Sequence, residues 1–500
     1  MNPIRTMLWK EGSSSFVITG LSIILALLVV RYVVATIRAT YFSPLRKVPG
    51  PLFSRVSTFR YFYHRFRGSF HQYVNNLHRQ YGPVVILSPE EVSFSQVEAV
   101  KQILVTDDFP KGKEYERFAG EDGGKEILTM TDKNQHRILR RMLSPAFSVS
   151  YLQELEPFLQ SCVQELMVWI RDECERTGGE TVFDVYTKIG QLTLDVIGNT
   201  SFGGSFHLVT KGSHPLTENI KSFLKKKFML AMCRLIGFII PGLVDKEYQY
   251  LHSFLSSKIM ERRQSTGKHR SDILQILIDA QDKERHGLSD DEVLSQALLF
   301  LIAGSETTAG TLFFTLLNLL RHPSSLAKLR EELEEAFPPT ARSLCVTRHS
   351  VLKQLPYLNA VVNEGLRVRS ITGNGVARFV NQEVEIGGYL IPPGTTVFAN
   401  YPMMHLDPAI WGDDAEEFRP ERFLSEYPPN AYTPFSAGTR NCIGKSFALM
   451  EVRIALASLL LNFEFEEIEG QSDQQVSFVT MRLKSGRFFV RVRPRKHLSL

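Results

Sequence analysis

The chain has 500 residues, of which 43% are hydrophobic and 22% are charged, so it can bury a core larger than a small domain needs. Its 58 basic and 53 acidic residues leave a net charge of +5, which is too balanced to favour nucleic-acid binding. Five cysteines, an odd number without a CxxC pair, argue against a disulfide framework or a zinc site and indicate a reducing compartment.

A long apolar segment lies near the amino terminus. Residues Phe16–Ile37 contain one charged residue, Arg31. A helix of this length spans a hydrocarbon layer of about 30 Å, and the long stem of Arg31 can reach the headgroups. A cleaved signal peptide would have a shorter apolar core and a cleavage site with small residues. We therefore expect one transmembrane helix, with a helix buried in the protein core as the alternative.

The charges around this segment predict its orientation. Arg5 and Lys10 precede it, whereas more basic residues follow it, namely Arg38, Arg46, Lys47, Arg55 and Arg60. The positive-inside rule then places the amino terminus in the lumen and the rest of the chain in the cytosol. The prolines of Val48–Pro51 interrupt any continuing helix. We expect residues 1–45 to be an anchor with its flank and residues 46–500 to form the folded body.

The folded body is predicted to be mainly helical. Helical periodicity dominates from Phe70 to Gln281, with a short strand-like piece at Val84–Leu87. The longest helical run extends from Asp290 to Leu320. Short β-type segments follow at Val376–Phe398, and a hairpin pattern at Val476–Val492 is expected to bend at Arg482–Arg487. The fold class is therefore mainly α with small β-sheets.

Two basic residues share one face of a predicted helix. His136 and Arg140 are spaced i, i+4, and the planar fork of an arginine suits a carboxylate. Taken singly, each is better explained as a solvated basic residue.

The longest helix contains the run Ala303-Gly-Ser-Glu306-Thr307-Thr308. A glycine inside a helix costs about 1 kcal/mol relative to alanine, and threonine hydroxyls can bond backbone carbonyls and open a groove. Glu306 is an acid within an apolar stretch, and an acid that feeds a hydroxyl is an arrangement for delivering protons. The alternative is a helix crossing made of small residues, with Glu306 pointing to solvent.

A carboxylate and a guanidinium are spaced i, i+3 further along the chain. Glu364 and Arg367 can pair on one helix face, and Arg422 follows within Phe418–Phe423. Such a pair is ordinarily a surface salt bridge worth less than about 1 kcal/mol.

One cysteine lies in the loop Phe435-Ser-Ala-Gly438-Thr-Arg440-Asn-Cys442-Ile-Gly444, just before an apolar helix. The helix start favours a thiolate there. A thiolate in an apolar loop suits a metal, and a haem iron with an axial cysteine is one known solution. Glycines would leave room for a flat ring. The alternative is an ordinary buried cysteine at a junction between loop and helix.

This loop resembles the signature of the cytochrome P450 family of haem-thiolate monooxygenases, in which Phe, Gly, Arg, Cys and Gly recur at the same spacing. The resemblance implies that Cys442 is the axial ligand of haem b and that Arg440 pairs with a haem propionate. It also implies that Phe435 packs under the ring beside the sulfur and that Gly438 belongs to the same cofactor-binding loop.

The resemblance assigns roles to the other motifs as well. Thr307 would be the oxygen-activating alcohol and Glu306 its acid. Arg140, Arg378 and His136 would be further propionate partners. A structural triad of Glu364, Arg367 and Arg422 would brace the haem loop. The family often has His-Pro or Pro-Pro after the triad helix, where this chain has Arg369-Ser370, so the shape of the adjacent substrate wall stays open.

The resemblance further implies a cytochrome P450 fold behind one transmembrane helix, anchored in the endoplasmic reticulum membrane with its catalytic domain in the cytosol. The expected reaction inserts one oxygen atom of dioxygen into a lipophilic small molecule, by hydroxylation or epoxidation in secondary metabolism. NADPH-cytochrome P450 reductase would supply the electrons, with cytochrome b5 as a second partner. The alternatives are an isomerase or dehydratase that uses no dioxygen, which commonly lacks the acid–alcohol pair, and a non-catalytic haem sensor, which needs no proton relay.

Overall fold

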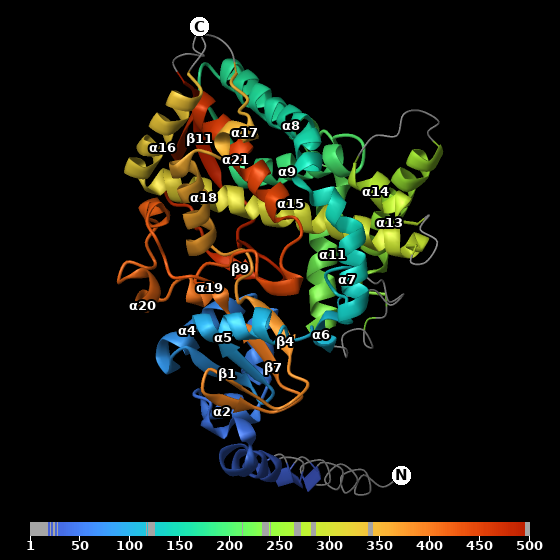
Figure 1. The fold of residues 1–500 in the computed structure, drawn as a ribbon, viewed down its shortest axis with the longest axis vertical. Coiled ribbons are helices and arrows are strands. Elements are labelled where there is room, and N and C mark those ends of the chain that lie inside the picture. The colour runs from blue at the N-terminus through green and yellow to red at the C-terminus, as the bar shows by residue number, and fades with distance from the viewer. Residues whose placement is uncertain are drawn as a thin grey trace, which may run out of the picture.

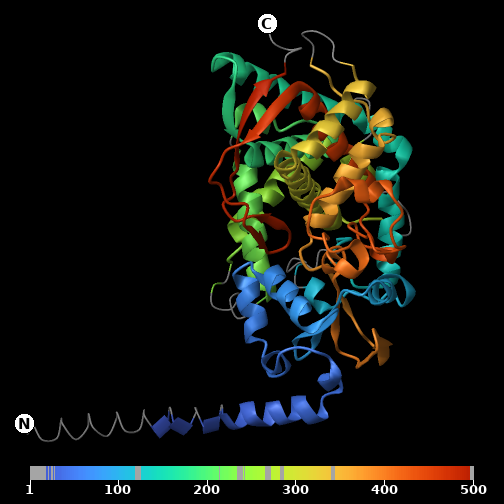
Figure 2. The same cartoon turned by 90° about the vertical axis from the view of Figure 1, so that its left-hand side faces the viewer.

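The computed structural model describes residues 19–495, apart from 21, 24–25, 28, 117, 119–125, 213, 233–239, 241, 265–271, 282–286 and 339–343. The amino-terminal part of the expected membrane span therefore lies outside the described residues. Residues 29–37 are helical, and their large apolar side chains are exposed. Figure 2 shows this helix projecting away from the body of the protein.

The larger lobe is built from long helices. These are α8 (Val149–Arg176), α9 (Val185–Ser201), α11 (Pro215–Met232), α13 (Asp245–Gln264), α15 (Asp290–Arg321), α16 (Pro323–Ala336), α18 (Pro356–Val368) and α21 (Lys445–Asn462). Figure 1 shows α15 crossing the middle of this lobe. A capping box starts α15, in which Ser289 and Glu292 bond each other's backbone N–H groups. The predicted run from Asp290 to Leu320 is thus confirmed.

Shorter helices complete the helical structure. The α-helices are α2 (Leu52–Val56), α3 (Phe59–Phe66), α4 (Phe70–Tyr81), α5 (Val97–Lys101), α6 (Lys113–Glu116), α7 (Lys133–Leu143), α10 (Leu208–Lys211), α14 (Ile273–Asp279), α17 (His349–Leu352), α19 (Tyr401–Met404) and α20 (Pro408–Trp411). The π and 3₁₀ segments are η1 (Arg38–Phe42), η2 (Pro44–Lys47), η3 (Gln102–Thr106), η4 (Ser144–Phe147), η5 (Pro420–Leu424) and η6 (Gly438–Arg440).

The strands form small sheets, as the sequence predicted. They are β1 (Val84–Ser88), β2 (Glu91–Phe94), β3 (Thr181–Asp184), β4 (Val376–Phe379), β5 (Val384–Ile386), β6 (Tyr389–Ile391), β7 (Thr396–Ala399), β8 (Phe463–Glu467), β9 (Gln475–Ser477), β10 (Met481–Leu483) and β11 (Phe489–Pro494). One sheet has the order β1-β2-β7-β4, and a second has the order β3-β11-β8. The hairpins β5–β6 and β9–β10 stand apart.

The predicted bend of the carboxyl-terminal hairpin is wrong. Arg482 lies within β10, opposite Val476 of β9, so the turn of the hairpin lies before it, at residues 478–480. The chain bends again at residues 484–486, but β10 and β11 do not pair across that bend. β11 pairs with β3 and β8 instead, because its alternate residues Val490 and Val492 are buried in the main core.

One candidate membrane-length helix is found among the described residues, and it is α15. By length and composition it could cross a bilayer, but 61% of its apolar window is buried inside the protein. α15 packs against α9, α18 and α21. Because α21 starts shortly after Cys442, this packing brings the helix with the acid–alcohol motif toward the cysteine loop.

Candidate functional site

The cysteine loop is closed by its own backbone. The N–H of Cys442 donates to the carbonyl of Phe435 at 3.0 Å, and η6 forms the turn between them. α21 begins at Lys445, in agreement with the predicted helix start. Cys442 therefore lies directly before the amino end of α21.

Glycine stands at two positions of the loop, and the space around the two differs. Gly438 has a φ of +72°, and a Cβ there would lie 1.8 Å from the carbonyl oxygen of Leu104. The close approach of η3 therefore demands glycine at this position, rather than space for a ring. At Gly444 a Cβ would meet only Phe147, at 3.9 Å, so the expected room exists there.

The thiol of Cys442 does not ionise by virtue of the loop alone. Burial raises its pKa, and this outweighs the Gly444 N–H and the charges of Arg140 and Lys445, which lower it. The helix start does favour the thiolate, as expected, because the Gly444 N–H lowers the pKa, but desolvation outweighs this effect. A bound metal cation would reverse the balance, since it deprotonates a coordinating thiol outright.

The surroundings of Cys442 fit a preassembled metal group better than a bare ion. Among the described residues no cluster of three or more His, Cys, Asp or Glu side chains could hold a metal ion. Cys442 would thus be a lone protein ligand, as in a haem with an axial thiolate. The side chain also keeps accessible surface, although burial governs its pKa.

Five basic side chains act on one another beside the loop, although they come from distant parts of the sequence: Lys111, His136, Arg140, Arg378 and Arg440. All except Arg140 are buried. The pKa of His136 is lowered to about 3, first by burial and then by the four other cations. Burial and the neighbouring arginines also hold the pKa of Lys111 well below its usual value. Gathering like charges in the interior is unfavourable unless an anion offsets them.

The described carboxylates offset this cluster only in part. Asp108 and Asp132 raise the pKa of Arg440, but burial and Arg378 still lower it to about 10. Glu126 acts on Lys111, yet burial raises the pKa of Glu126 itself to about 7. A group with two carboxylates, such as haem with its propionates, therefore fits this set of donors.

Hydrogen bonds hold the cysteine loop against α7. Arg440 donates to the carbonyls of Met130 at 2.6 Å and Asp132 at 3.2 Å, which lead into the helix. In return, Arg140 donates to Asn441 through its carbonyl at 2.7 Å and its side chain at 2.5 Å. Two of the expected propionate partners, Arg140 and Arg440, thus link α7 and the segment before it to the cysteine loop.

Arg378 and Lys111 retain unused donor capacity. Arg378 on β4 is 1% exposed, and its Nε has no hydrogen-bond partner among the described residues. Lys111 donates to the carbonyl of Leu128 at 2.5 Å. Sequence reasoning missed Lys111, because no spacing or motif links it to the other members of the cluster.

Thr307 belongs to a row of hydroxyls along α15. Its Oγ1 donates to the carbonyl of Ala303 at 2.7 Å, as the sequence predicted for such a threonine. Thr311 and Thr315 repeat the contact one and two turns later, at 2.9 Å and 2.7 Å. Ala303 is exposed although it lies in the middle of a core helix, so this face of α15 keeps accessible surface.

Glu306 lies in the interior rather than in solvent. Burial raises its pKa, while Arg482 on β10 and then Lys221 on α11 lower it. Gly310, one turn later, would bring a Cβ to 2.9 Å from Ile371. The proposed alternative of a solvent-facing Glu306 therefore does not apply, and the carboxyl is held toward its protonated form.

The structure brings the three expected triad residues together. Arg367 donates to both carboxylate oxygens of Glu364, at 2.6 Å and 2.7 Å, and both side chains are fully buried. Arg422 lies 3.5 Å from the same carboxylate. An exposed salt bridge is therefore not the right description of this pair.

The contacts around the triad were not apparent from the sequence. Arg367 also donates to the carbonyls of His405 and Ala415, each at 2.6 Å. Arg422 pairs with Asp414 at 2.6 Å. The partners of Arg367 are backbone carbonyls about forty to fifty residues away, which residue type and spacing cannot indicate. The acid that pairs with Arg422 belongs to no motif that the sequence analysis singled out.

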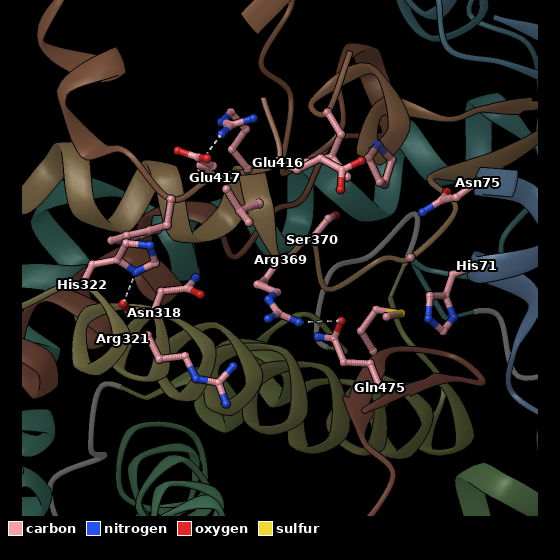
Figure 3. Close-up of a pocket in the computed structure, with 17 residues that line it drawn as sticks. His71, Asn75, Asn318, Arg321, His322, Arg369, Ser370, Glu416, Glu417 and Gln475 are labelled. Atoms are coloured by element: carbon pink, nitrogen blue, oxygen red, sulfur yellow. Dashed lines mark hydrogen bonds between the residues drawn. The ribbon is translucent and has the colours of Figure 1, made fainter. Parts of the chain in front are cut away.

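A separate polar cavity of about 380 Å³ lies at the carboxyl ends of α15 and α18 (Figure 3). Two of its arginines are paired within the protein: Arg321 bonds Glu467 at 2.7 Å, and Arg369 bonds Asp473 at 2.9 Å. The described lining residues include neither Cys442 nor the acid–alcohol pair. This cavity is therefore not the predicted chemical centre.

Comparisons with known proteins agree with this geometry. A family model described as Cytochrome P450 matches residues 48–487. Cytochrome P450 monooxygenase FUS8 of Gibberella fujikuroi is 35% identical over 91% of this chain and 89% of its own length. Cytochrome P450 monooxygenase acrD of Aspergillus aculeatus is 32% identical over 95% of this chain and 97% of its own. Cytochrome P450 3A41 of Mus musculus is 32% identical over 74% of this chain and 75% of its own.

Proposed function

The chain belongs to the cytochrome P450 family and is a monooxygenase, and from its site we propose that it inserts one atom of dioxygen into a C–H or C=C bond of a lipophilic small molecule. The observation that carries the proposal is the combination of a cysteine without other metal-ligating side chains around it among the described residues, an undercompensated basic cluster, and an acid on α15 whose pKa is raised by burial. We propose secondary metabolism as its setting, on the breadth of the family alone.

We propose Cys442 as the axial ligand of haem b, with Phe435 and Gly438 in the loop that supports it. Arg378, Arg440, Arg140 and His136 would hold the propionates, together with Lys111. Arg378 is favoured by its unused Nε donor. When bound, haem supplies the redox-active iron on which dioxygen is activated.

Proton delivery is the part of the reaction that the chain's own residues perform. Burial raises the pKa of Glu306, which favours the protonated carboxyl and suits this residue to hold a proton inside the protein. The hydroxyl of Thr307 donates its hydrogen to the carbonyl of Ala303, which leaves the oxygen lone pairs able to accept a hydrogen bond from a protonated group. We propose that Glu306 is the proton source and that the Thr307 hydroxyl, on turning from the Ala303 carbonyl, passes its own hydrogen to the dioxygen that is reduced as it accepts one from the acid. We also propose that the triad of Glu364, Arg367 and Arg422 acts only structurally.

We propose that residues 1–45 anchor the enzyme in the endoplasmic reticulum membrane, with residues 46–500 as a cytosolic catalytic domain. The exposed apolar side chains of the projecting helix support this division, and the family match begins at residue 48. Electrons would come from NADPH through NADPH-cytochrome P450 reductase, with cytochrome b5 as a second donor. Both partners follow from the family rather than from a surface of this protein.

The ligand assignment is tested with the purified holoprotein. We expect the reduced carbon-monoxide complex to show the thiolate-shifted Soret band, and Cys442→His to abolish that band. An unshifted spectrum in the unmodified protein would rule the assignment out. Difference spectra against terpenoids, polyketides and fatty acids, followed by NADPH turnover with each binder, would then identify the substrate class.

A further inference from the structure

His405 lies between the buried Glu364–Arg367 pair and the cysteine loop. It directly follows α19, and its side chain is fully buried. Its carbonyl accepts a hydrogen bond from Arg367 Nη1 at 2.6 Å. Its ring Nε2 accepts the backbone N–H of Thr433 at 3.0 Å. One residue therefore contacts both the triad and the segment that leads to Cys442.

The contact with Thr433 is made at the start of the cysteine loop. Thr433 lies two residues before Phe435, whose carbonyl accepts the N–H of Cys442 at 3.0 Å. The loop is thus held at its beginning by His405 and closed on itself at the cysteine. A displacement of Thr433 would pass through Phe435 to the backbone that carries the sulfur.

The imidazole of His405 is suited to accept this bond. Nε2 can accept only in the neutral ring, whose proton is then on Nδ1. Burial and the charge of Arg367 lower the pKa of His405 to about 3, so the ring stays neutral at ordinary pH. The rings of Tyr401 and Tyr432 pack beside it, with centroids 5.8 Å and 5.3 Å away.

The bond to Thr433 distinguishes this histidine from an apolar ring. Nδ1 is buried and has no hydrogen-bond partner among the residues described. A buried donor without a partner is unfavourable, so Nδ1 gives no reason for a histidine at this position. The reason is Nε2, which accepts the hydrogen bond from Thr433.

We propose that His405 is a positioning residue that sets the geometry of the Cys442 loop by linking Thr433 to the Glu364–Arg367 pair. The proposal rests on the proposed role of Cys442 as axial ligand. His405 touches no reacting atom and acts through the backbone N–H of Thr433.

The test compares two substitutions of similar length and volume. In His405→Gln the side-chain oxygen can still accept a hydrogen bond, whereas in His405→Met it cannot. Tyr432→Phe serves as a control, because it removes a neighbouring hydrogen bond to Asn363 but leaves the link to Thr433. The measurement is the rate at which the reduced carbon-monoxide complex of each holoprotein changes from the thiolate-type to the neutral-thiol-type spectrum.

We expect His405→Met to convert at least about tenfold faster than the unmodified protein, and His405→Gln and Tyr432→Phe to stay within about threefold. The haem reduction potential should shift in His405→Met and be restored in His405→Gln, which a role in packing alone would not produce. Loss of haem in His405→Met but not in His405→Gln would support the same conclusion.

Equal behaviour of the Gln and Met variants, including failure of both to fold, would overturn the proposal, because the acceptor would then be irrelevant. A second comparison uses Thr433→Pro, which removes the donor and leaves His405 in place. Its effect should not add to that of His405→Met, since both delete one bond. If the unmodified protein lacks the thiolate-type spectrum, the Cys442 assignment fails instead.

Discussion

Substituting Gly438 by alanine should destabilise the cysteine loop more than the strain of a positive φ alone would. A Cβ at this position would lie 1.8 Å from the carbonyl oxygen of Leu104, so η3 and η6 would have to move apart by more than about 1 Å. Gly486 provides a matched control, because its φ of +69° is close to the +72° of Gly438 and a Cβ there meets no atom within 4 Å.

The two variants separate strain from overlap. Gly486→Ala should lower the free energy of unfolding by about 1–2 kcal/mol, the cost of an alanine in the left-handed region. Gly438→Ala carries the same strain and a further cost of about 1–3 kcal/mol for overpacking. Urea denaturation followed by circular dichroism measures both, and the ratio of haem to protein reports on the loop. Equal midpoints and equal haem content would refute the steric argument.

Three further predictions follow from the site. Thr307→Ala should keep haem and substrate binding but divert electrons to hydrogen peroxide; unchanged product per NADPH would mean that Thr307 only packs the helix. Arg482→Gln removes the charge that lowers the pKa of Glu306 most, so Glu306 should stay protonated to higher pH. The alkaline limb of the profile of product per NADPH against pH should therefore move to higher pH. A limb that does not move, or that moves to lower pH, would contradict this. Deletion of residues 1–40 should release much of the protein from membranes with the haem spectrum intact, as fractionation can show, whereas failure to take up haem would mean that this segment belongs to the folded core.

Motifs that are contiguous in the sequence could be interpreted from it. The cysteine loop, the acid–alcohol run and the Glu364–Arg367 pair each lie within one turn or one helix, so their spacing carries the information. The long helix from Asp290 was predictable for a related reason, because its apolar length and its cap are local properties. The carboxyl-terminal strands were mispredicted, because the pairing of β11 with β3 depends on a partner about three hundred residues away.

The charge balance of the site was decided only by the tertiary structure. The sequence alone predicted a helix start that favours the thiolate of Cys442, whereas burial, which depends on the whole fold, raises the pKa of that thiol. Lys111 joins the basic cluster and His405 reaches Thr433 only after distant segments pack together. The sequence by itself therefore determined which chemical groups the chain carries and their local spacing. Their desolvation and their long-range partners came from the fold, because both depend on atoms that are far apart along the chain.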